Sequence, residues 1–368
     1  MNTHTVTLAD RDGVEARQIA FFAAFLLPIY KLVETPSLLA GFLQGDLLLP
    51  ALLHFLLDTG IIAVVLYCAS RSQKTLLQRL IETLGGWVKV VYWALCIFFL
   101  LAAVLPLLDL EKFVYSVFYD TAPTLFSFAF FFIFAAFLAT KGLKALGRLG
   151  DLCLFLFALP FFALIAMSLV EADFTNLLPF FEKRFGDTMY AMNYTKAHFT
   201  DAIFLLPLLL NLRYKKGDGL KIGAGYAGGA LMTLLFLAVF YGLFSSIAPR
   251  EHYAFAKIAQ YFPVLSVIGR IDLFFVFVLC IPLFFYVATP LHYATHFLSS
   301  AFEVKGKTLI SAGVCLAALV FTLFFNRRYD GIYALFGNTL SFIFYLFDFA
   351  PLALLFLPKK SKKEAVYA

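Results

Sequence analysis

Residues 20–42 read AFFAAFLLPIYKLVETPSLLAGF, an apolar stretch whose middle carries charged residues between two prolines. Pro28 and Pro36 bracket this polar part, which contains Lys31 and Glu34. Each proline removes a backbone donor and clashes with the preceding helical turn. Ionisable groups inside an apolar run are costly unless they face protein or a cavity. The stretch therefore predicts a membrane helix that is broken where its polar side chains lie.

The rest of the chain has the composition of a membrane protein. Its 368 residues are 62% hydrophobic and 14% charged, with a mean hydropathy of +0.88. Soluble domains are about 45–50% apolar and about 25% charged. A bilayer span needs roughly 20 mostly apolar residues, and such stretches follow one another between residues 18 and 358. Composition therefore indicates an all-α integral membrane protein.

We expect about ten membrane-spanning helices from these stretches. The expected spans are residues 18–42, 47–69, 87–108, 123–140, 149–170, 197–212, 222–247, 268–298, 309–325 and 332–357. The first 17 residues are polar and lack the apolar core of a secretory signal, so we expect the first helix to be retained.

Basic residues cluster in alternate loops. These clusters lie at residues 71–79, 141–148, 213–221, 305–307 and 359–363. By the positive-inside rule, these loops and both chain termini face the cytoplasm. Asp109 and Glu111 are expected in an outer loop. The net charge of +6 is thus a signal of topology rather than of a nucleic-acid partner.

Ten spans with both ends inside divide into two halves of five that insert with opposite orientation. This is the arrangement of an inverted-repeat transporter. We expect a cytoplasmic N-terminal segment at 1–17, one transmembrane domain at 18–358 with repeats at 18–170 and 197–357, and a basic cytoplasmic tail at 359–368. Such folds break the first helix of each half near the middle of the membrane.

The sixth expected span begins the second half and also carries a charge and a proline. Residues 198–212 read HFTDAIFLLPLLLNL, with Asp201 and Pro207. Asp201 is predicted either to contact a ligand or ion, or to cap the start of the helix. Phe204 lies one turn further on. We predict a ligand site at the two helix breaks, made of Pro28, Lys31, Glu34, Thr35, Asp201 and Phe204.

Several motifs, taken in order, resemble one family. TKGLKALGRLGDL (140–152) is similar to the junction between the fourth and fifth helices of spore-germination permeases, the B subunits of nutrient germinant receptors. DFTNLLPFF (173–181) resembles an external stretch of the same family. Further agreement comes from KLVETPSLLA (31–40), TLLQRLIETLGG (75–86) and HYAFAKIAQYFPVLSVIGRID (252–272). The resemblance covers essentially the whole chain.

This resemblance implies the amino acid, polyamine and organocation transporter superfamily and its LeuT-like five-plus-five inverted repeat. It also implies a nutrient ligand such as an amino acid, partner receptor subunits, and the inner membrane of the spore. One departure concerns the ligand, because many amino-acid carriers have a Gly-rich break where this chain reads AAFLLP (23–28). The alternatives are a stand-alone proton-coupled amino acid permease and, less favoured, a membrane-bound acyltransferase-type enzyme.

Other polar residues inside the spans have two readings each. Lys31 and Glu34, three residues apart, are expected to pair with each other or with the ligand, or else to snorkel and to cap a half-helix. His54 and Asp58 share one helix face, which favours a structural contact between helices and leaves a proton relay as the alternative. Asp348 lies between two phenylalanines and needs a partner across the bundle, and with His54 and Asp58 it is a candidate for an ion or proton relay.

No residue pattern in the sequence calls for a cofactor, a metal or a catalytic centre. The five cysteines lie in apolar runs without metal-ligand spacing, so we interpret them as packing residues. His292 and His296 are four apart, but Tyr293 replaces the glutamate of a zinc-protease motif. The glycines of GAGYAGGA (223–230) lack the lysine of a phosphate loop and are expected to allow close helix packing.

Overall fold

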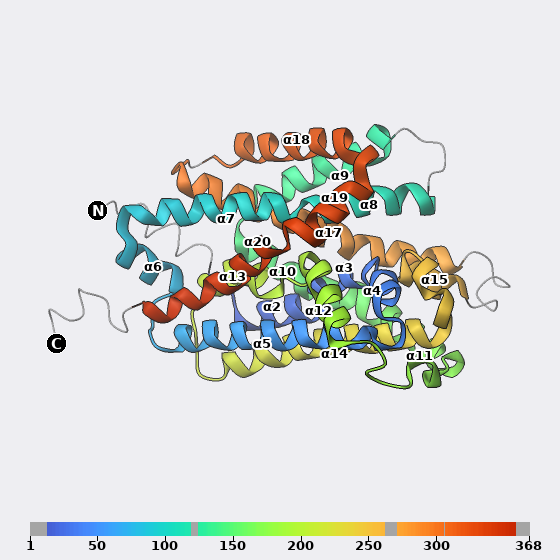
Figure 1. Cartoon of the computed structure of the whole chain (residues 1–368). Helices are drawn as coiled ribbons and strands as arrows, with labels where there is room; N and C mark the ends of the chain where they lie inside the picture. Colours follow the sequence, from blue (N-terminus) through green and yellow to red (C-terminus); the bar gives the residue numbers. More distant parts are fainter. Residues whose placement is uncertain (1–12, 119–123, 262–270, 305, 358–368) are drawn as a thin grey trace.

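The computed structural model describes residues 13–118, 124–261, 271–304 and 306–357, and helix is the regular structure throughout these ranges. Both expected terminal segments, and the first residues of the expected spans at 123 and 268, lie largely outside them. Figure 1 shows helices running along one long direction, with α5 beside α14 at one edge and α9 beside α18 at the other. The helices are α2 (Ala16–Phe21), α3 (Leu27–Lys31), α4 (Thr35–Leu43), α5 (Leu48–Ser70), α6 (Leu76–Leu84), α7 (Val88–Ala102), α8 (Val104–Phe118), α9 (Thr124–Ala139), α10 (Leu143–Cys153), α11 (Leu159–Glu171), α12 (Phe185–Tyr194), α13 (Asp201–Leu210), α14 (Asp218–Phe244), α15 (Ala254–Tyr261), α17 (Ile271–Ala301), α18 (Thr308–Phe325), α19 (Tyr329–Ala334) and α20 (Ser341–Phe349).

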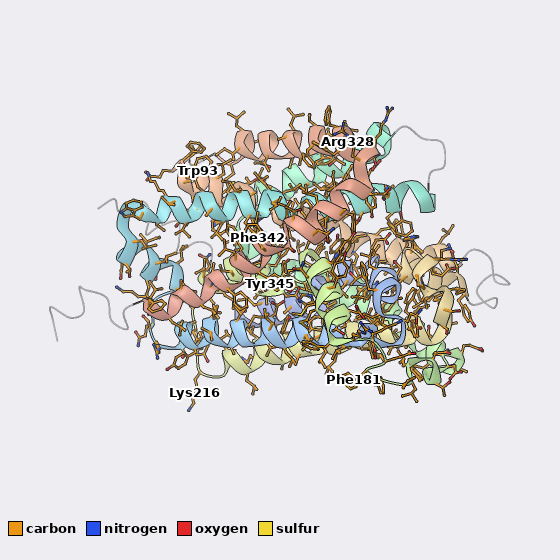
Figure 2. All side chains as sticks on the ribbon, in the orientation of Figure 1. Trp93, Phe181, Lys216, Arg328, Phe342 and Tyr345 are labelled. Atoms are coloured by element: carbon orange, nitrogen blue, oxygen red, sulfur yellow. The ribbon has the colours of Figure 1, made fainter. Side chains whose placement is uncertain are left out.

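Six helical stretches in the described residues are long and apolar enough to cross a membrane, and two further apolar helices are shorter. The outer surface suits lipid, because large apolar side chains such as Trp93 and Phe342 project from it (Figure 2). The six stretches are Thr35–Ser70, Leu76–Val114, Leu143–Glu171, Asp218–Arg250, Leu273–Ala301 and Thr308–Thr339, and the shorter helices are Phe128–Ala139 and Ser341–Phe356. Neither the first nor the sixth expected span forms one continuous helix, and this agrees with the predicted breaks.

The first expected span consists of α2, a π-helical turn at Phe22–Leu26, α3 and α4, with the break between Lys31 and Thr35. Pro28 and Pro36 each lie in the first turn of a helical segment, α3 and α4. A proline is tolerated there because the missing N–H has no helical acceptor. The two prolines therefore set the starts of the segments on both sides of the break, as the sequence predicted.

Backbone groups at this break are bonded to another helix. The carbonyls of Leu32 and Val33 accept hydrogen bonds from the backbone N–H groups of Phe255 and Ala254, at 3.2 and 2.9 Å. The first N–H groups of any helix lack partners within the helix, and α15 uses two of them here. These two backbone bonds stabilise the break inside the protein.

The sixth span is broken as well, but it begins earlier than the sequence indicated. The short helix α12 comes first, followed by a 3-10 turn at Lys196–His198 and then α13. The expected span of 197–212 missed α12, whose sequence FGDTMYAMNY is too polar and too short to be recognised from hydropathy. A break is present as predicted, but it lies before Asp201, whereas Pro207 lies inside α13. The predicted starting point of this span was wrong.

Close packing between α14 and the first span depends on two glycines. A Cβ at Gly225 would lie 2.4 Å from the carbonyl oxygen of Ala20, and one at Gly229 would lie 2.6 Å from that of Ala23. Such approach requires the absence of a side chain. The interpretation of these glycines as packing residues is confirmed.

Asp109 and Glu111 were expected in an outer loop, but both lie within α8 and are buried, with 2% and 4% exposed surface. Helix α8 therefore continues beyond residue 108, where the sequence-based span ended. The error arose because acidic residues lower hydropathy whether they end a helix or point into its protein neighbours.

Candidate functional site

The breaks of the first and sixth spans meet at one buried ion pair. Lys31, in the last turn of α3, donates from Nζ to Asp201 Oδ1 at 2.6 Å, and both side chains are almost wholly buried. Lys31 Nζ also bonds the Leu27 carbonyl at 3.1 Å and lies 5.5 Å from the centre of the Phe199 ring. Of the alternatives for Lys31, the contact seen is across the bundle to Asp201 rather than along the helix to Glu34.

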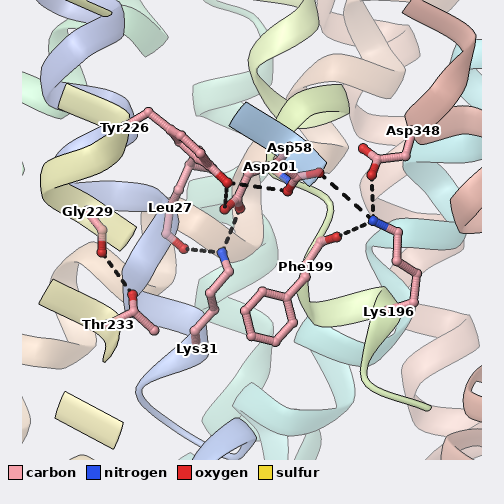
Figure 3. Close-up of polar contacts among 10 residues, drawn as sticks. All are labelled: Leu27, Lys31, Asp58, Lys196, Phe199, Asp201, Tyr226, Gly229, Thr233 and Asp348. Carbon is pink, nitrogen blue, oxygen red and sulfur yellow. Dashed lines mark hydrogen bonds and ion pairs between the residues drawn. The ribbon is translucent and has the colours of Figure 1, made fainter. Parts of the chain in front are cut away.

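Asp201 does not cap α13, although it is the first residue of that helix. The cap comes from Asp58 on α5, whose Oδ2 accepts the backbone N–H of Asp201 at 3.2 Å. Tyr226 on α14 donates to Asp201 Oδ2 at 3.1 Å and lies 3.4 Å from Asp58 Oδ2. Asp201 therefore directs its carboxylate at Lys31, and Figure 3 shows the side chains of Lys31 and Tyr226 meeting at Asp201.

Asp348 on α20 has its partner in Lys196, which sits in the turn between α12 and α13. The Lys196 ammonium lies 2.5 Å from Asp348 Oδ2 and 4.0 Å from Asp58 Oδ1, and it donates to the Phe199 carbonyl at 2.7 Å. The Lys196 and Asp348 side chains are fully buried. Sequence reasoning missed Lys196, although a lysine directly before a Pro-interrupted apolar segment was a usable signal.

A stack of aromatic rings passes beside the ion pair. Tyr30 lies between His198 and Tyr286, with ring centres 5.1 Å away on each side. Tyr286 in turn stacks on Phe204, one of the predicted ligand residues, at 5.6 Å. Within the described residues, His198 Nδ1 and Tyr293 Oη are buried without a hydrogen-bond partner. Buried polar atoms normally have partners, so these two atoms are candidates for contact with a ligand.

A second buried carboxylate anchors this stack. Asp109 accepts hydrogen bonds from the hydroxyls of Tyr30, Tyr329 and Tyr333 at 2.5, 2.7 and 2.8 Å. Tyr333 also lies 3.2 Å from His198 Nε2. This cluster could not be predicted from the sequence, because its members come from four separate parts of the chain.

Glu34 and Thr35 lie on the far side of the break from Lys31. Glu34 Oε2 is 3.2 Å from His252 Nδ1 in an ion pair whose histidine side chain is 62% exposed. That hydrogen bond raises the pKa of His252 above its ordinary value. Thr35 is buried, and its Oγ1 has no partner within the described residues. Glu34 therefore faces the exposed end of the break rather than the Lys31 site.

The histidines are used in separate contacts. His54 Nε2 is 3.0 Å from the Met192 carbonyl, and its ring stacks on Phe199 at 4.5 Å. His54 and Asp58 thus contact the two halves of the sixth span independently. His292 Nε2 is 2.8 Å from the Lys141 carbonyl. Among the described residues, no group of three His, Cys, Asp or Glu side chains has metal-binding geometry.

Comparison with solved structures gives the class of this fold. The chain is similar to a manganese transporter from Eremococcus coleocola, crystallised with an aromatic bis-isothiourea substituted compound, with a TM-score of 0.57 at 12% identity over 96% of this chain and 80% of that one. A weaker similarity is to the inward-facing conformation of Mhp1, with a TM-score of 0.44 at 14% identity over 94% of this chain and 77% of that one. The likeness to the manganese transporter and the broken first and sixth helices give a LeuT-type fold.

Sequence comparison gives the family. The profile described as spore germination protein matches residues 50–330, about three quarters of the chain. The chain belongs to this spore germination protein family. No curated protein matches it in sequence. Family and fold indicate a multi-pass membrane protein of transporter type rather than an enzyme, so the acyltransferase alternative is set aside.

Proposed function

We propose that the chain is the transporter-fold membrane subunit of a spore germinant receptor, and that it senses or translocates a small nutrient between the first and sixth helices. Family membership supports the link to germination, and the partners would be the other receptor subunits. The location would be the inner membrane of the spore, with both termini in the cytoplasm, as the basic loops indicate.

The observation that carries this proposal is the ion pair between Lys31 and Asp201. The pair joins the two broken helices at their breaks. A zwitterionic amino acid carries one carboxylate and one ammonium group. Its carboxylate could bind Lys31 and its ammonium Asp201, so that one internal pair is exchanged for two ligand pairs with no change in net charge. We therefore propose an amino acid or a similar zwitterion as the ligand.

The aromatic stack supports the same ligand class. Phe204 and Tyr286 offer an apolar wall, and the unpartnered His198 Nδ1 and Tyr293 Oη offer polar contacts. Small-molecule sites usually combine an apolar lining with a few such polar groups. A divalent metal ion suits this position less well, because the ammonium groups of Lys31 and Lys196 would repel it.

The second candidate is a stand-alone proton-coupled amino acid permease. It would need no partner subunits and should accumulate substrate in vesicles, whereas a receptor subunit should depend on its partners for a response. Genes for two partner subunits beside this one would favour the receptor.

The test is ligand-dependent thermal stabilisation of the purified chain with a panel of amino acids, since a ligand of the native state raises apparent stability. In the variants Lys31→Met and Asp201→Asn, we expect the concentration for half response to rise at least tenfold, about 1.4 kcal/mol. Glu34→Gln should alter it less. His292→Gln is the matched control, because His292 bonds the Lys141 carbonyl and not a group of the proposed site. Loss of stability with an unchanged half-response concentration in the first two variants would refute this site.

A further inference from the structure

The charged centre described above contains more carboxylates than ammonium groups. Asp58, Asp201 and Asp348 face Lys31 and Lys196, and all five side chains are at most 5% exposed. With every group ionised, the cluster would carry one uncompensated negative charge. A buried charge without a partner is strongly disfavoured inside a membrane protein.

The excess charge falls on one side of the cluster. Lys31 and Asp201 form a balanced pair at 2.6 Å, which leaves Asp58 and Asp348 to share the single ammonium of Lys196. Figure 3 shows both of these carboxyl groups turned toward Lys196 Nζ. The remaining charged or titratable groups around them are His54, Tyr226 and Tyr345, none of which adds a cation while His54 is neutral.

Two oxygen atoms show where the compensation is missing. Asp58 Oδ1 and Asp348 Oδ1 are buried, and neither accepts a hydrogen bond from any described residue. The other oxygen of each group is already bonded, Asp58 Oδ2 to the Asp201 backbone N–H and Asp348 Oδ2 to Lys196. Both carboxyl groups also approach the same Lys196 ammonium, Asp58 Oδ1 at 4.0 Å and Asp348 Oδ2 at 2.5 Å. Two buried carboxylates that share one cation repel each other when both are ionised.

We propose that Asp58 and Asp348 share one bound proton. The proton makes the five-residue cluster neutral and gives one unpartnered oxygen a hydrogen to donate to the other carboxyl group. A sodium ion fits less well, because the Lys196 ammonium occupies the space between the carboxyl groups, 2.5 and 4.0 Å from their oxygens. This site goes beyond nutrient binding, since it takes a different ligand at a different set of residues.

The shared proton links two helices that belong to different repeats. Asp58 lies on α5 in the first half and Asp348 on α20 in the second, with Lys196 from the sixth span between them. Release of the proton leaves a net negative charge and removes the hydrogen bond between α5 and α20. Protonation therefore favours the arrangement of the two halves seen here.

The test is infrared spectroscopy of the purified chain in lipid nanodiscs, where a protonated aspartic acid has a carbonyl band that a carboxylate lacks. We expect the band at neutral pH, and expect carbon-13 labelling of the aspartate carboxyl groups to shift it. Asp58→Asn and Asp348→Asn should each abolish it, because either change makes the cluster neutral without a proton. Asp109→Asn, which removes another buried aspartate, is the matched control and should retain the band.

Three outcomes would overturn the proposal. One is the absence of a label-sensitive band from the unmodified chain at neutral pH, which also decides the matter if neither variant folds. Another is a band that survives in Asp58→Asn and Asp348→Asn, or is lost in Asp109→Asn alone. The third is stabilisation of a band-free chain by sodium but not by choline, which would make the ligand a metal cation. None of these results depends on nutrient binding, so the proton site and the nutrient site can fail separately.

Discussion

The buried ion pair between Lys31 and Asp201 allows a quantitative test of the centre. Lys31→Met keeps the length of the side chain but removes its ammonium, leaving Asp201 buried beside Tyr226 with no cation at 2.6 Å. Removing one partner of a buried pair costs about 3–5 kcal/mol. At about 1.4 kcal/mol per tenfold change, the ratio of unfolded to folded protein should rise roughly 10²- to 10³-fold or more.

The double variant Lys31→Met/Asp201→Asn supplies the decisive comparison. It replaces both charges by neutral groups of similar size, and such replacement of a buried pair is often neutral or stabilising. We therefore expect it to be more stable than Lys31→Met alone. The free energy of unfolding would be measured by denaturant titration in mixed micelles, followed by circular dichroism and without added ligand.

Two results would refute this reasoning. If Lys31→Met cost less than about 1 kcal/mol, the pair would behave as a solvent-exposed one. If the destabilisation of the double variant equalled the sum of the two single destabilisations, the two charges would not be coupled, since coupling appears as non-additivity in such a cycle.

Three further predictions concern the periphery of the molecule. His252→Gln should lower stability in acid but not in alkali, by no more than about 1 kcal/mol because the His252 side chain is 62% exposed. The bond to Glu34 raises the pKa of His252, so the stabilisation by the pair is complete below the free histidine pKa of about 6.5 and is lost as pH rises through the raised pKa. An equal loss of stability in acid and in alkali would contradict the ion pair. Gly225→Val should destabilise the chain by about 1–3 kcal/mol or more, because its Cβ would lie 2.4 Å from a backbone oxygen of α2, whereas Gly228→Val, which meets no atom within 4 Å, should cost much less in the same denaturation assay. A cysteine introduced beside Lys216 should react with an impermeant thiol reagent only after the membrane is permeabilised, and reaction in intact cells would reverse the topology.

The breaks in the two half-repeats could be predicted because their causes are local. Pro28 and Pro36 act on the turns in which they lie, and a charge such as Lys31 or Asp201 is conspicuous in an apolar run. Hydropathy and proline position therefore place the break in the first span, whereas the break in the sixth span lies before Asp201 and not at Pro207. The pairing of those charges could not be predicted, because Lys31 and Asp201 are 170 residues apart in the sequence.

Other parts of the centre had no local signal. Lys196 and Asp348 are 152 residues apart, and nothing near either residue specifies the other. Asp109 was assigned to a loop because an acidic residue at the end of an apolar run looks the same whether it meets water or three tyrosine hydroxyls. Tertiary packing decides between these environments.

The two backbone bonds between α15 and the break in the first helix make a mechanical coupling. Leu32 and Val33 cannot move away from α15 without breaking both bonds, which contribute about 0.5–1.5 kcal/mol each. The same movement would break the contact of Glu34 with His252, which lies just before α15. Helix α15 and the break in the first span are thus coupled, and a displacement of α15 moves the backbone at Leu32, the residue after Lys31. A molecule that displaced α15 would therefore disturb the proposed nutrient site without contacting it.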